Sequence, residues 1–447
     1  MPLNDDELTL IRRLNRKLTA AERYTVLMDR YYEGEQRLEH IGLAVPPELR
    51  RFETVLNVPR VAVDEPERRL DVRALVLPGE DKSDDKLLEL WTANNMDSQA
   101  SLLHKDTMIY GRGFVSVGAN EDDPDLPLIR VEPTDAMTCE INNRTRSMTS
   151  AFRLYKDESG KVVQATLYLP DKTIWLERER GRWVAVDSDD HGLGKVPVVL
   201  YLNRPRTGRW QGTSEMKDVI GLTDAIARTL TNMQLAGETA AIPHKVLFGA
   251  TTQDFVDQNG KPIPVWEAYF TSLLGIKNPQ GKIGEFSAAN LSNFHDQVNS
   301  LFSWAAAVLG LPTRYAGQQT VNPAAEGAIR ADESRLIKNT ERKQSSLGDC
   351  HGWTMALASE IAGRPVDGNR VGCLWYDAGT PTYSQRADAI QKLAGGVPIL
   401  SREGAWDEMG WSENRKKRER QYFDAQDRDP TFEDLADAVR GRAPVGA

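Results

Sequence analysis

Cysteine is scarce in this chain of 447 residues, which holds only Cys139, Cys350 and Cys373. The three cysteines form no C-x-x-C pair and no even framework, so neither a disulfide nor a cysteine-based zinc site is expected. We expect reduced thiols in a cytoplasmic setting.

Long apolar runs are also absent, and no stretch approaches the length of a membrane-spanning helix. The first residues, Met1 to Glu7, are acidic where a secretory signal would be basic. The sequence therefore predicts a soluble, unexported chain without membrane contact.

Catalytic motifs are missing as well. The nearest approach to a phosphate-binding loop is Gly275 to Ile283, but five residues separate its glycines where a Walker A loop has four, and isoleucine follows the lysine. None of the six histidines has a metal-binding spacing, and there is no G-x-S-x-G elbow. We expect no catalytic residue, no metal and no cofactor, and we interpret the histidines as surface or core residues.

Positive charge is in deficit, with 56 Lys plus Arg against 65 Asp plus Glu and a net charge of −9. This balance argues against a protein whose main task is to grip phosphate tightly. The run from Arg415 to Arg420 is the kind of cluster that contacts nucleic acid, but Glu413, Glu419 and Asp424 interleave with it, which is typical of a solvated helix face. Both interpretations stay open.

Two long helical patterns dominate what is present. Apolar residues recur at three- and four-residue spacing in Ser214 to Ala241 and again in Ala288 to Leu309. Between them, residues 243–286 form an insert rich in Pro, Gly and β-type residues, too short to bury a large core. The pair is either a hairpin inside an ordinary α-rich core or a stalk that assembles with neighbours.

The remaining segments mix helices and strands. A helical stretch from Leu8 to Arg37 is predicted to divide at the capping-box pattern Thr19 to Glu22, and its Tyr31-Tyr32 pair indicates either a binding patch or a docking face. A helix over 86–110 precedes a β-rich block at 114–200. A long helix from Asn322 to about Ala362, with a kink or break at its glycines, is followed by a strand over 371–376 and helices at 384–393, 401–409 and 413–425.

Several short motifs occur in a distinctive order along these parts. They are Tyr31-Tyr32-Glu33-Gly34-Glu35-Gln36, Tyr110-Gly111-Arg112-Gly113-Phe114, Gly194-Lys195-Val196-Pro197-Val198-Val199, and Gly212-Thr213-Ser214-Glu215 with Leu222-Thr223-Asp224-Ala225. In the residues of these motifs and in the order of its parts, the chain from about Leu8 to about Pro430 resembles the portal (head-to-tail connector) proteins of tailed double-stranded-DNA bacteriophages of the long-tailed, siphophage type. The resemblance implies an α+β fold with a mainly α-helical wing, stem and crown, a β-rich block in the wing and a small α/β clip.

The resemblance also implies a division of the chain. The expected parts are an N-terminal wing (1–212), a first stem helix (213–242), a clip (243–286), a second stem helix (287–310), a wing segment (311–378) that contains the tunnel loop (316–323) and a long kinked helix, a C-terminal helical crown region (379–430) and a flexible tail (431–447).

A portal protein is expected to form a ring of about twelve copies, a dodecamer, at one capsid vertex, and such a ring closes through heterologous contacts. Double-stranded DNA would pass through it during packaging and ejection. The implied partners are the terminase motor, a head-tail adaptor and the major capsid and scaffolding proteins; the implied locations are the portal vertex of the virion and, during assembly, the host cytoplasm.

Two sets of residues receive roles from the resemblance. The tunnel loop would offer uncharged polar groups to DNA in the channel, and its residues are Gly317, Gln318, Gln319, Thr320, Val321 and Asn322. The clip would dock motor and adaptor through aromatic side chains, namely Phe248, Phe255, Trp266, Tyr269 and Phe270. For Trp266 and Tyr269, a miniature core of the insert is an equally good interpretation.

Two other classes remain open at this point. One is an enzyme of phage DNA processing, which the missing phosphate loop and metal cluster disfavour. The other is a non-viral helical interaction scaffold, which predicts a monomer or dimer.

Overall fold

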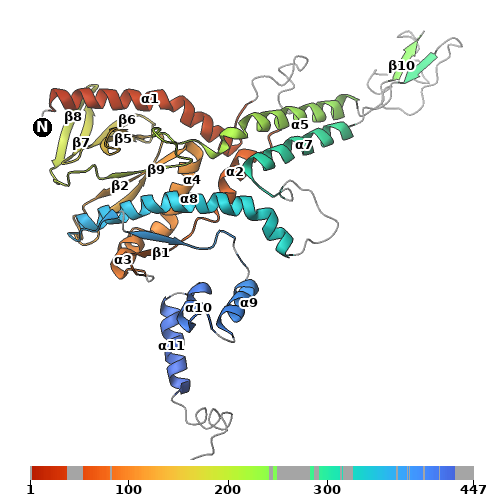
Figure 1. Cartoon of the computed structure of the whole chain (residues 1–447). Helices are drawn as coiled ribbons and strands as arrows, with labels where there is room; N and C mark the ends of the chain where they lie inside the picture. Colours follow the sequence, from red (N-terminus) through yellow and green to blue (C-terminus); the bar gives the residue numbers. More distant parts are fainter. Residues whose placement is uncertain are drawn as a thin grey trace, which may run out of the picture.

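The computed structural model describes residues 3–37, 54–80, 83–240, 245–248, 282–285, 291–312, 315, 326–368, 371–379, 381, 383–395, 398–411 and 413–427. Within these ranges the chain is a mixture of helices and antiparallel sheets, as expected for the α+β class. A body of helices and sheets carries a protruding helical pair at one end and three short helices at the other (Figure 1).

The N-terminal helix α1 (Asp5–Glu33) lies over a five-stranded antiparallel meander, in which each strand pairs with the next. The strands are β4 (Met137–Ile141), β5 (Met148–Lys156), β6 (Val162–Tyr168), β7 (Thr173–Glu179) and β8 (Arg182–Asp189). Ile11, Leu14 and Leu18 of α1 are buried against the inner face of this sheet, together with Phe152 and Leu167. The middle of the predicted β-rich block, residues 137–189, is thus a sheet whose apolar face is covered by one amphipathic helix.

The predicted division of α1 at Thr19 is wrong, because the helix continues without a break from Asp5 to Glu33. The capping box forms instead at the true start, where Asn4 accepts from the Glu7 amide and Glu7 accepts from the Asn4 amide. The Thr19 hydroxyl donates to the Asn15 carbonyl inside the helix at 3.2 Å, so it is not used as a cap.

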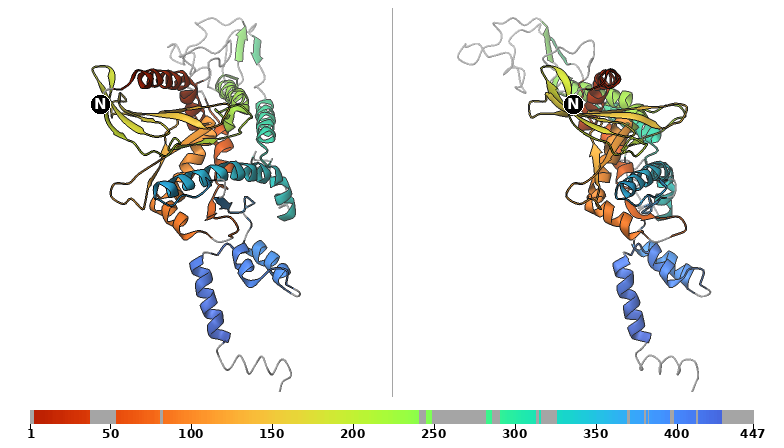
Figure 2. Two further views of the ribbon diagram at one scale, coloured as in Figure 1. Left: turned by 60° about the vertical axis from the view of Figure 1, so that its left-hand side comes forward. Right: turned by 90° about the vertical axis from the view of Figure 1, so that its left-hand side faces the viewer.

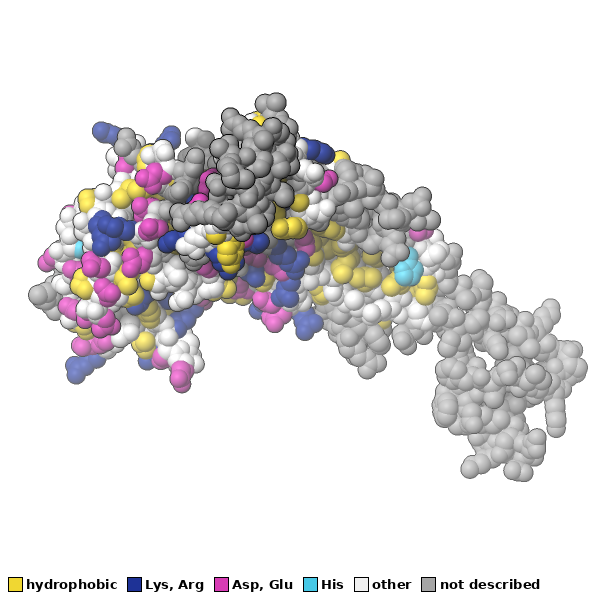
Figure 3. All heavy atoms as spheres, turned by 90° about the horizontal axis from the view of Figure 1, so that it is seen from below, with side chains coloured by type: hydrophobic (Ala, Val, Ile, Leu, Met, Phe, Trp, Pro, Cys, Tyr) yellow, Lys and Arg dark blue, Asp and Glu magenta, His cyan; other side chains and the backbone are white. Residues whose placement is uncertain are grey.

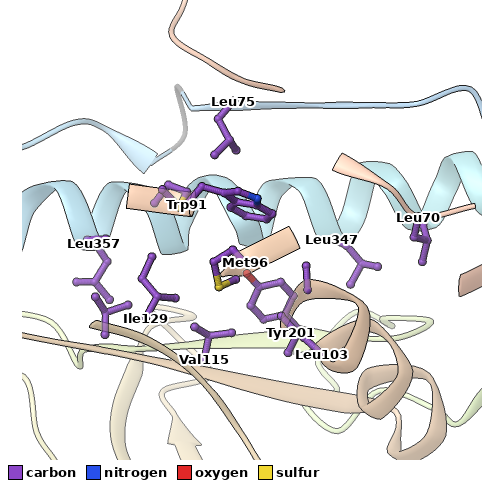
Figure 4. Close-up of a cluster of buried hydrophobic side chains, with 14 of the residues drawn as sticks. Leu70, Leu75, Trp91, Met96, Leu103, Val115, Ile129, Tyr201, Leu347 and Leu357 are labelled. Carbon is purple, nitrogen blue, oxygen red and sulfur yellow. The ribbon is translucent and has the colours of Figure 1, made fainter. Parts of the chain in front are cut away.

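The main core lies between helix α8 (Glu326–Ile361) and a three-stranded sheet of order β3-β2-β9. These strands are β2 (Arg112–Gly118), β3 (Leu128–Glu132) and β9 (Val198–Leu202); helices α2 (Val58–Glu67), α3 (Asp85–Ala93) and α4 (Met96–Tyr110) pack around them. Figure 4 shows Leu347 and Leu357 of α8 above Val115, Tyr201 and Leu103 from the sheet and α4. This core joins the part of the chain before the helical pair to the part after it.

Helix α8 runs unbroken past Gly348 and Gly352, so the glycines do not end it. They lie under the antiparallel pair of β1 (Val72–Val76) and β12 (Gly372–Trp375). A Cβ at Gly352 would lie 2.5 Å from the Val371 carbonyl oxygen, and one at Gly348 would lie 3.0 Å from the Trp375 indole nitrogen. Glycine is therefore present for close packing of the helix on the strand that follows it.

The two long predicted helices lie side by side, run in opposite directions and project from the body (Figures 1 and 2). A single 3₁₀ turn, η2 (Glu215–Asp218), precedes α5 (Ile220–Ala240), and α7 (Ser292–Leu309) returns to the body. Beyond them, β10 (Lys245–Phe248) pairs antiparallel with β11 (Lys282–Glu285). The two predicted helices are confirmed, although the first begins after a turn and the second is described from Ser292.

Three helices end the described chain at the opposite side of the body from α5 and α7 (Figure 2). They are α9 (Tyr383–Ala394), α10 (Arg402–Glu408) and α11 (Glu413–Asp427), close to the predicted ranges. None of the helices within the described ranges has the length and apolar character needed to cross a membrane.

Candidate functional site

The projecting pair α5–α7 has a thin core of its own. Its buried residues include Val219, Ile226, Leu301 and Ala305, which meet Val58 of α2 at the body. On the other side of the same stretch of α7, Trp304 is 60% exposed and Val308 is 52% exposed. Large apolar side chains thus remain on the surface of a helix whose base is well packed, which is how an interaction face differs from an ordinary solvent face.

The same pair is poor in charge. Four of its 39 helical residues are charged, three of 21 in α5 and one of 18 in α7, whereas 27% of the whole chain is charged. The exposed positions of α7 are mostly neutral and polar, among them Asn293, Gln297, Asn299 and Ser300. Such a surface offers hydrogen bonds without a strong field of either sign.

Two of the glycine motifs meet at the root of α5. Gly111 and Gly212 both have left-handed backbones, with φ of 88° and 58°. A Cβ on Gly212 would lie 1.9 Å from the Gly111 carbonyl oxygen, and one on Gly111 would lie 2.8 Å from the Thr213 nitrogen. Two backbone segments can cross this closely only where neither residue has a side chain. Gly111 is therefore required by the segment at Gly212, and Gly212 by the segment at Gly111.

Asn203, which directly follows β9, forms hydrogen bonds with both segments of this crossing. Its amide nitrogen donates to the Gly111 carbonyl and its carbonyl accepts from the Thr213 amide, both at 2.9 Å. Its side-chain nitrogen donates to the Thr213 carbonyl at 2.8 Å and to Glu215 at 2.9 Å. The sequence gives no motif for this residue, and only the crossing identifies it.

Helix α8 is tied to the same point by Lys343. Its ammonium group donates to Glu215 Oε2 at 2.6 Å and to Asn203 Oδ1 at 2.7 Å, and only 11% of the lysine side chain is exposed. This partly buried ion pair connects the turn that opens α5 with the middle of α8. A movement of either helix therefore changes the surroundings of one shared charge pair.

The tyrosine pair at the end of α1 docks helices and forms no free patch. Tyr31 is buried, and its hydroxyl donates to the Asp224 carboxylate of α5 at 3.0 Å. The Tyr32 hydroxyl donates to Asp64 of α2 at 2.9 Å. Both side chains thus fix the orientation of α1 relative to the root.

The six predicted tunnel-loop residues, Gly317 to Asn322, lie outside the described residues. Described residues on both sides of that segment meet at Arg69, in the connection between α2 and β1. The Arg69 guanidinium lies 3.7 Å from Glu333 and donates to the Tyr315 hydroxyl at 3.4 Å and to the Ala378 carbonyl at 2.8 Å. One half-buried arginine therefore contacts residues that precede and follow the loop in sequence.

Of the five predicted clip aromatics, Phe255, Trp266, Tyr269 and Phe270 lie outside the described residues. Phe248 ends strand β10, where its backbone is paired with that of Lys282 on β11. The β-type character of the insert is confirmed at these two strands. The docking role of the aromatics stays a prediction.

A cavity of about 460 Å³ opens beside the root, between α8 and the carboxyl end of α7. Val308, Leu309, Arg342 and Lys343 contribute to its lining. Val308 and Leu309 give this cavity an apolar side, whereas Glu215, Asp218 and Arg342 make the rest of its lining polar and charged.

The basic run in α11 is largely used inside the C-terminal helices. Lys416 is buried and paired with Asp407, and Arg420 forms two contacts with Glu403 at 2.6 and 2.7 Å. Arg415 lies over the Trp411 ring at 4.1 Å. These contacts account for three of the five cations, leaving Lys417 and Arg418 exposed without such a contact in the described chain.

Two histidines meet in the main core. His104 Nε2 lies 2.9 Å from His351 Nε2, and both rings are fully buried. Burial lowers the pKa of His104 to about 3 and also lowers the pKa of His351, with the neighbouring ring adding to the effect. The described residues hold no group of three potential metal ligands. The pair is a neutral core contact between α4 and α8, as the core interpretation expects.

Comparison with known proteins gives this geometry its context. Residues 13–430 match the family model described as phage portal protein, SPP1 Gp6-like. The chain is 38% identical over 394 residues to the portal protein of Mycobacterium phage D29, covering 86% of this chain and 81% of that protein. It is 36% identical over 404 residues to the portal protein of Mycobacterium phage L5, covering 88% and 83%.

A solved structure shares the fold at low identity. A chain from the neck of an empty gene transfer agent (GTA) particle, computed with C6 symmetry, has a TM-score of 0.51 and 13% identity, covering 87% of this chain and 94% of that one. The family match over residues 13–430 and the two curated relatives show that the chain belongs to the phage portal protein family.

Proposed function

We propose that copies of this chain form a closed ring, the portal, at one vertex of a phage capsid. The ring is the channel through which double-stranded DNA is packaged and ejected, and it is the platform on which the terminase motor and then the head-tail adaptor dock. Family membership supports the setting. The single observation that carries the ring is the projecting pair α5–α7, whose apolar side chains are incompletely buried within one chain.

Ring closure follows from the asymmetry of this pair. A cyclic ring is built from heterologous contacts, in which one face of a subunit meets a different face of the next. Trp304 and Val308 supply an apolar face on α7, and the cavity beside Val308 adds a concave surface next to it. The number of copies, about twelve on the family's pattern, is part of the proposal.

The channel surface is proposed to be neutral and polar. The low charge of α5 and α7 supports this, because Lys and Arg would hold phosphates through release of counterions and slow a sliding duplex. The loop 317–322, with Gln318, Gln319, Thr320 and Asn322, continues this chemistry. Arg69 fixes the described residues that flank it.

The division into wing, stem, clip, crown and tail also remains part of this proposal. On it, α5 and α7 are the stem, β10 and β11 belong to the clip, and α9 to α11 belong to the crown region. The clip aromatics are proposed to dock motor and adaptor, and the role is structural without catalysis.

Native mass spectrometry and negative-stain imaging of the purified chain test the central claim. A closed ring with a central opening is the expected result, and a chain that stays monomeric or dimeric at high concentration would refute it. Complementation of a portal-deficient phage then tests the channel. Replacement of 317–322 by a Gly-Ser linker is expected to impair DNA packaging or retention while rings still form. An assay for ATPase and nuclease activity with magnesium, expected to be negative, tests the non-enzymatic role.

A further inference from the structure

One face of α1 carries a straight row of unpaired positive charge. Arg12, Arg16, Arg23 and Arg30 are all exposed, and no ion pair involves their side chains within the described ranges. At 100° per residue their directions differ by no more than about 40°, and the row is about 27 Å long. Leu14, Leu18 and Met28 point the other way, into the cores under the helix.

The row contrasts with the net charge of the chain and with the face of the molecule seen from below. The chain has a net charge of −9, and on the face seen in Figure 3 positive and negative side chains are interspersed. Neighbouring Arg13 is already paired, with both oxygens of Glu140, at 2.6 and 2.7 Å. Arg12 and Arg16, four residues apart, repel each other, and an anionic partner covering the row would relieve this repulsion and match its charge.

Two apolar residues lie within the row. Val26 is 43% exposed and Leu27 is 45% exposed, between Arg23 and Arg30. Arg16, Arg23 and Arg30 are spaced by seven residues, the repeat at which a partner helix stays in register. Glu22 and Glu33 border the row on one side and would repel phosphates. Apolar residues and bordering acids favour a protein partner over nucleic acid, and like charge excludes α1 of a second copy.

We propose that the exposed face of α1 is a docking surface for an acidic segment of another protein, an amphipathic helix with carboxylates at about seven-residue spacing. The inference rests on the proposed function for its setting. The exposed face of α1 is directed away from the sheet that the helix covers, on the side of the body where α5 and α7 project and away from α9 to α11 (Figures 1 and 2). The proposed function puts the clip end outside the head, and with that orientation this face is directed toward the protein shell around the vertex.

Charge reversal tests the surface in the full chain. The variant Arg12→Glu, Arg16→Glu, Arg23→Glu, Arg30→Glu is compared with one that reverses four exposed arginines in or directly beside the turns of the five-stranded sheet, Arg144, Arg146, Arg180 and Arg182. Both change the net charge equally. In a portal-deficient phage infection, the α1 variant is expected to form normal rings but to enter heads about tenfold less often or worse, with the control near wild type. Equal incorporation of the two variants would overturn the proposal.

Photo-crosslinking identifies the occupant. A photoreactive amino acid at position 26 or 27 is expected to give, in infected cells, an adduct whose partner peptide is an acidic segment of a shell or assembly protein. An adduct with DNA, with a second portal copy or with a segment lacking acidic residues would overturn the inference, as would no adduct at all. Failure of the wild-type chain to form rings or to enter heads would instead count against the proposed function.

Discussion

The body and the projecting helical pair of this chain differ in how far they complete their own burial. In α4, seven of fifteen residues are buried, including Leu103 and Met108. In α7, three of eighteen are buried, and Trp304 and Val308 face solvent. The body satisfies the requirements of a folded domain within one copy, whereas the helical pair is anchored at its base and open along its length. The body therefore holds most of the burial that stabilises the single chain, and on the proposed function the open helical pair is the part that assembles.

The crossing of Gly111 and Gly212 decides whether the two regions are joined correctly, so breaking it has the largest expected effect. In Gly212→Ala the new Cβ would lie 1.9 Å from the Gly111 carbonyl oxygen, a backbone atom that cannot move without displacing β2. We expect a loss of more than about 4 kcal/mol, seen as insoluble protein or a collapse of the urea midpoint.

Gly208→Ala is the matched control, because Gly208 also has a left-handed backbone, with φ of 73°, but no atom lies within 4 Å of its added Cβ. It should cost only about 1–2 kcal/mol. Equal losses in the two variants would show that backbone conformation, and not the crossing, explains the glycine at 212.

Lys343→Met separates the root from α8 without altering either backbone. It leaves Glu215 partly buried with only Asn203 as a side-chain donor, and loss of one partner of such a pair costs about 3 kcal/mol or more. The control Lys338→Met removes an exposed partner of Glu341 on the same helix and should cost less than about 1 kcal/mol. Chemical denaturation of the purified chains measures both, and a Lys343→Met loss no larger than the control would argue against coupling at this point.

The Asp106 carboxyl lowers the stability of the body when it is ionised. Burial raises the pKa of its carboxyl to about 6, and the charges of Asp29 and Asp135 add to the shift. The folded chain therefore holds this proton more tightly than the unfolded chain does. The contribution of protonated Asp106 to the free energy of unfolding is fully present below the unfolded pKa of 3.8 and is lost as the pH rises through the folded pKa of about 6. At pH values above about 7, the ionised side chain therefore destabilises the fold.

Asp106→Asn should stabilise the unassembled chain at slightly alkaline pH by about 1–2 kcal/mol, below a ceiling of about 3 kcal/mol, and should have no such effect near pH 4. Thermal unfolding at the two pH values measures this. Asp122→Asn, in an exposed turn, is the control and should change stability by less than about 0.5 kcal/mol at either pH. A gain of the same size at both pH values would contradict the electrostatic explanation.

How much of this was predictable from sequence depends on whether the cause is local. Helical periodicity predicted α5, α7 and the C-terminal helices, and the alternating segments predicted the sheet, because those patterns reflect burial on one face. The capping pattern at Thr19 misled because the same residues can cap a helix or lie within one, and packing of Leu14 and Leu18 on the sheet decides.

The root of the helical pair was beyond such reasoning. Gly111 and Gly212 are about a hundred residues apart in sequence, and only their contact in space explains both. Asn203, Lys343 and Arg69 carry ordinary polar side chains in segments without any motif, so no periodicity or spacing marks them. The basic run of α11 is the opposite case, a strong local pattern that is explained mostly by contacts within the chain. Most of its cations contact Asp407, Glu403 and Trp411 within the C-terminal helices.

Trp304→Ser has the smallest expected effect on the single chain and separates the two regions most sharply. A side chain that is already 60% exposed loses little burial, so we expect a change of less than about 0.5 kcal/mol in the unfolding of the monomer. If α7 completes its burial against a second copy, the same substitution should lower the ring fraction in native mass spectrometry severalfold, and Trp175→Ser, 39% exposed on β7, should not. An unchanged ring fraction would place the interface between copies elsewhere. A large loss of monomer stability would instead mean that Trp304 belongs to the core of one copy. In that case the distinction between a complete body and an incomplete helical pair would no longer hold.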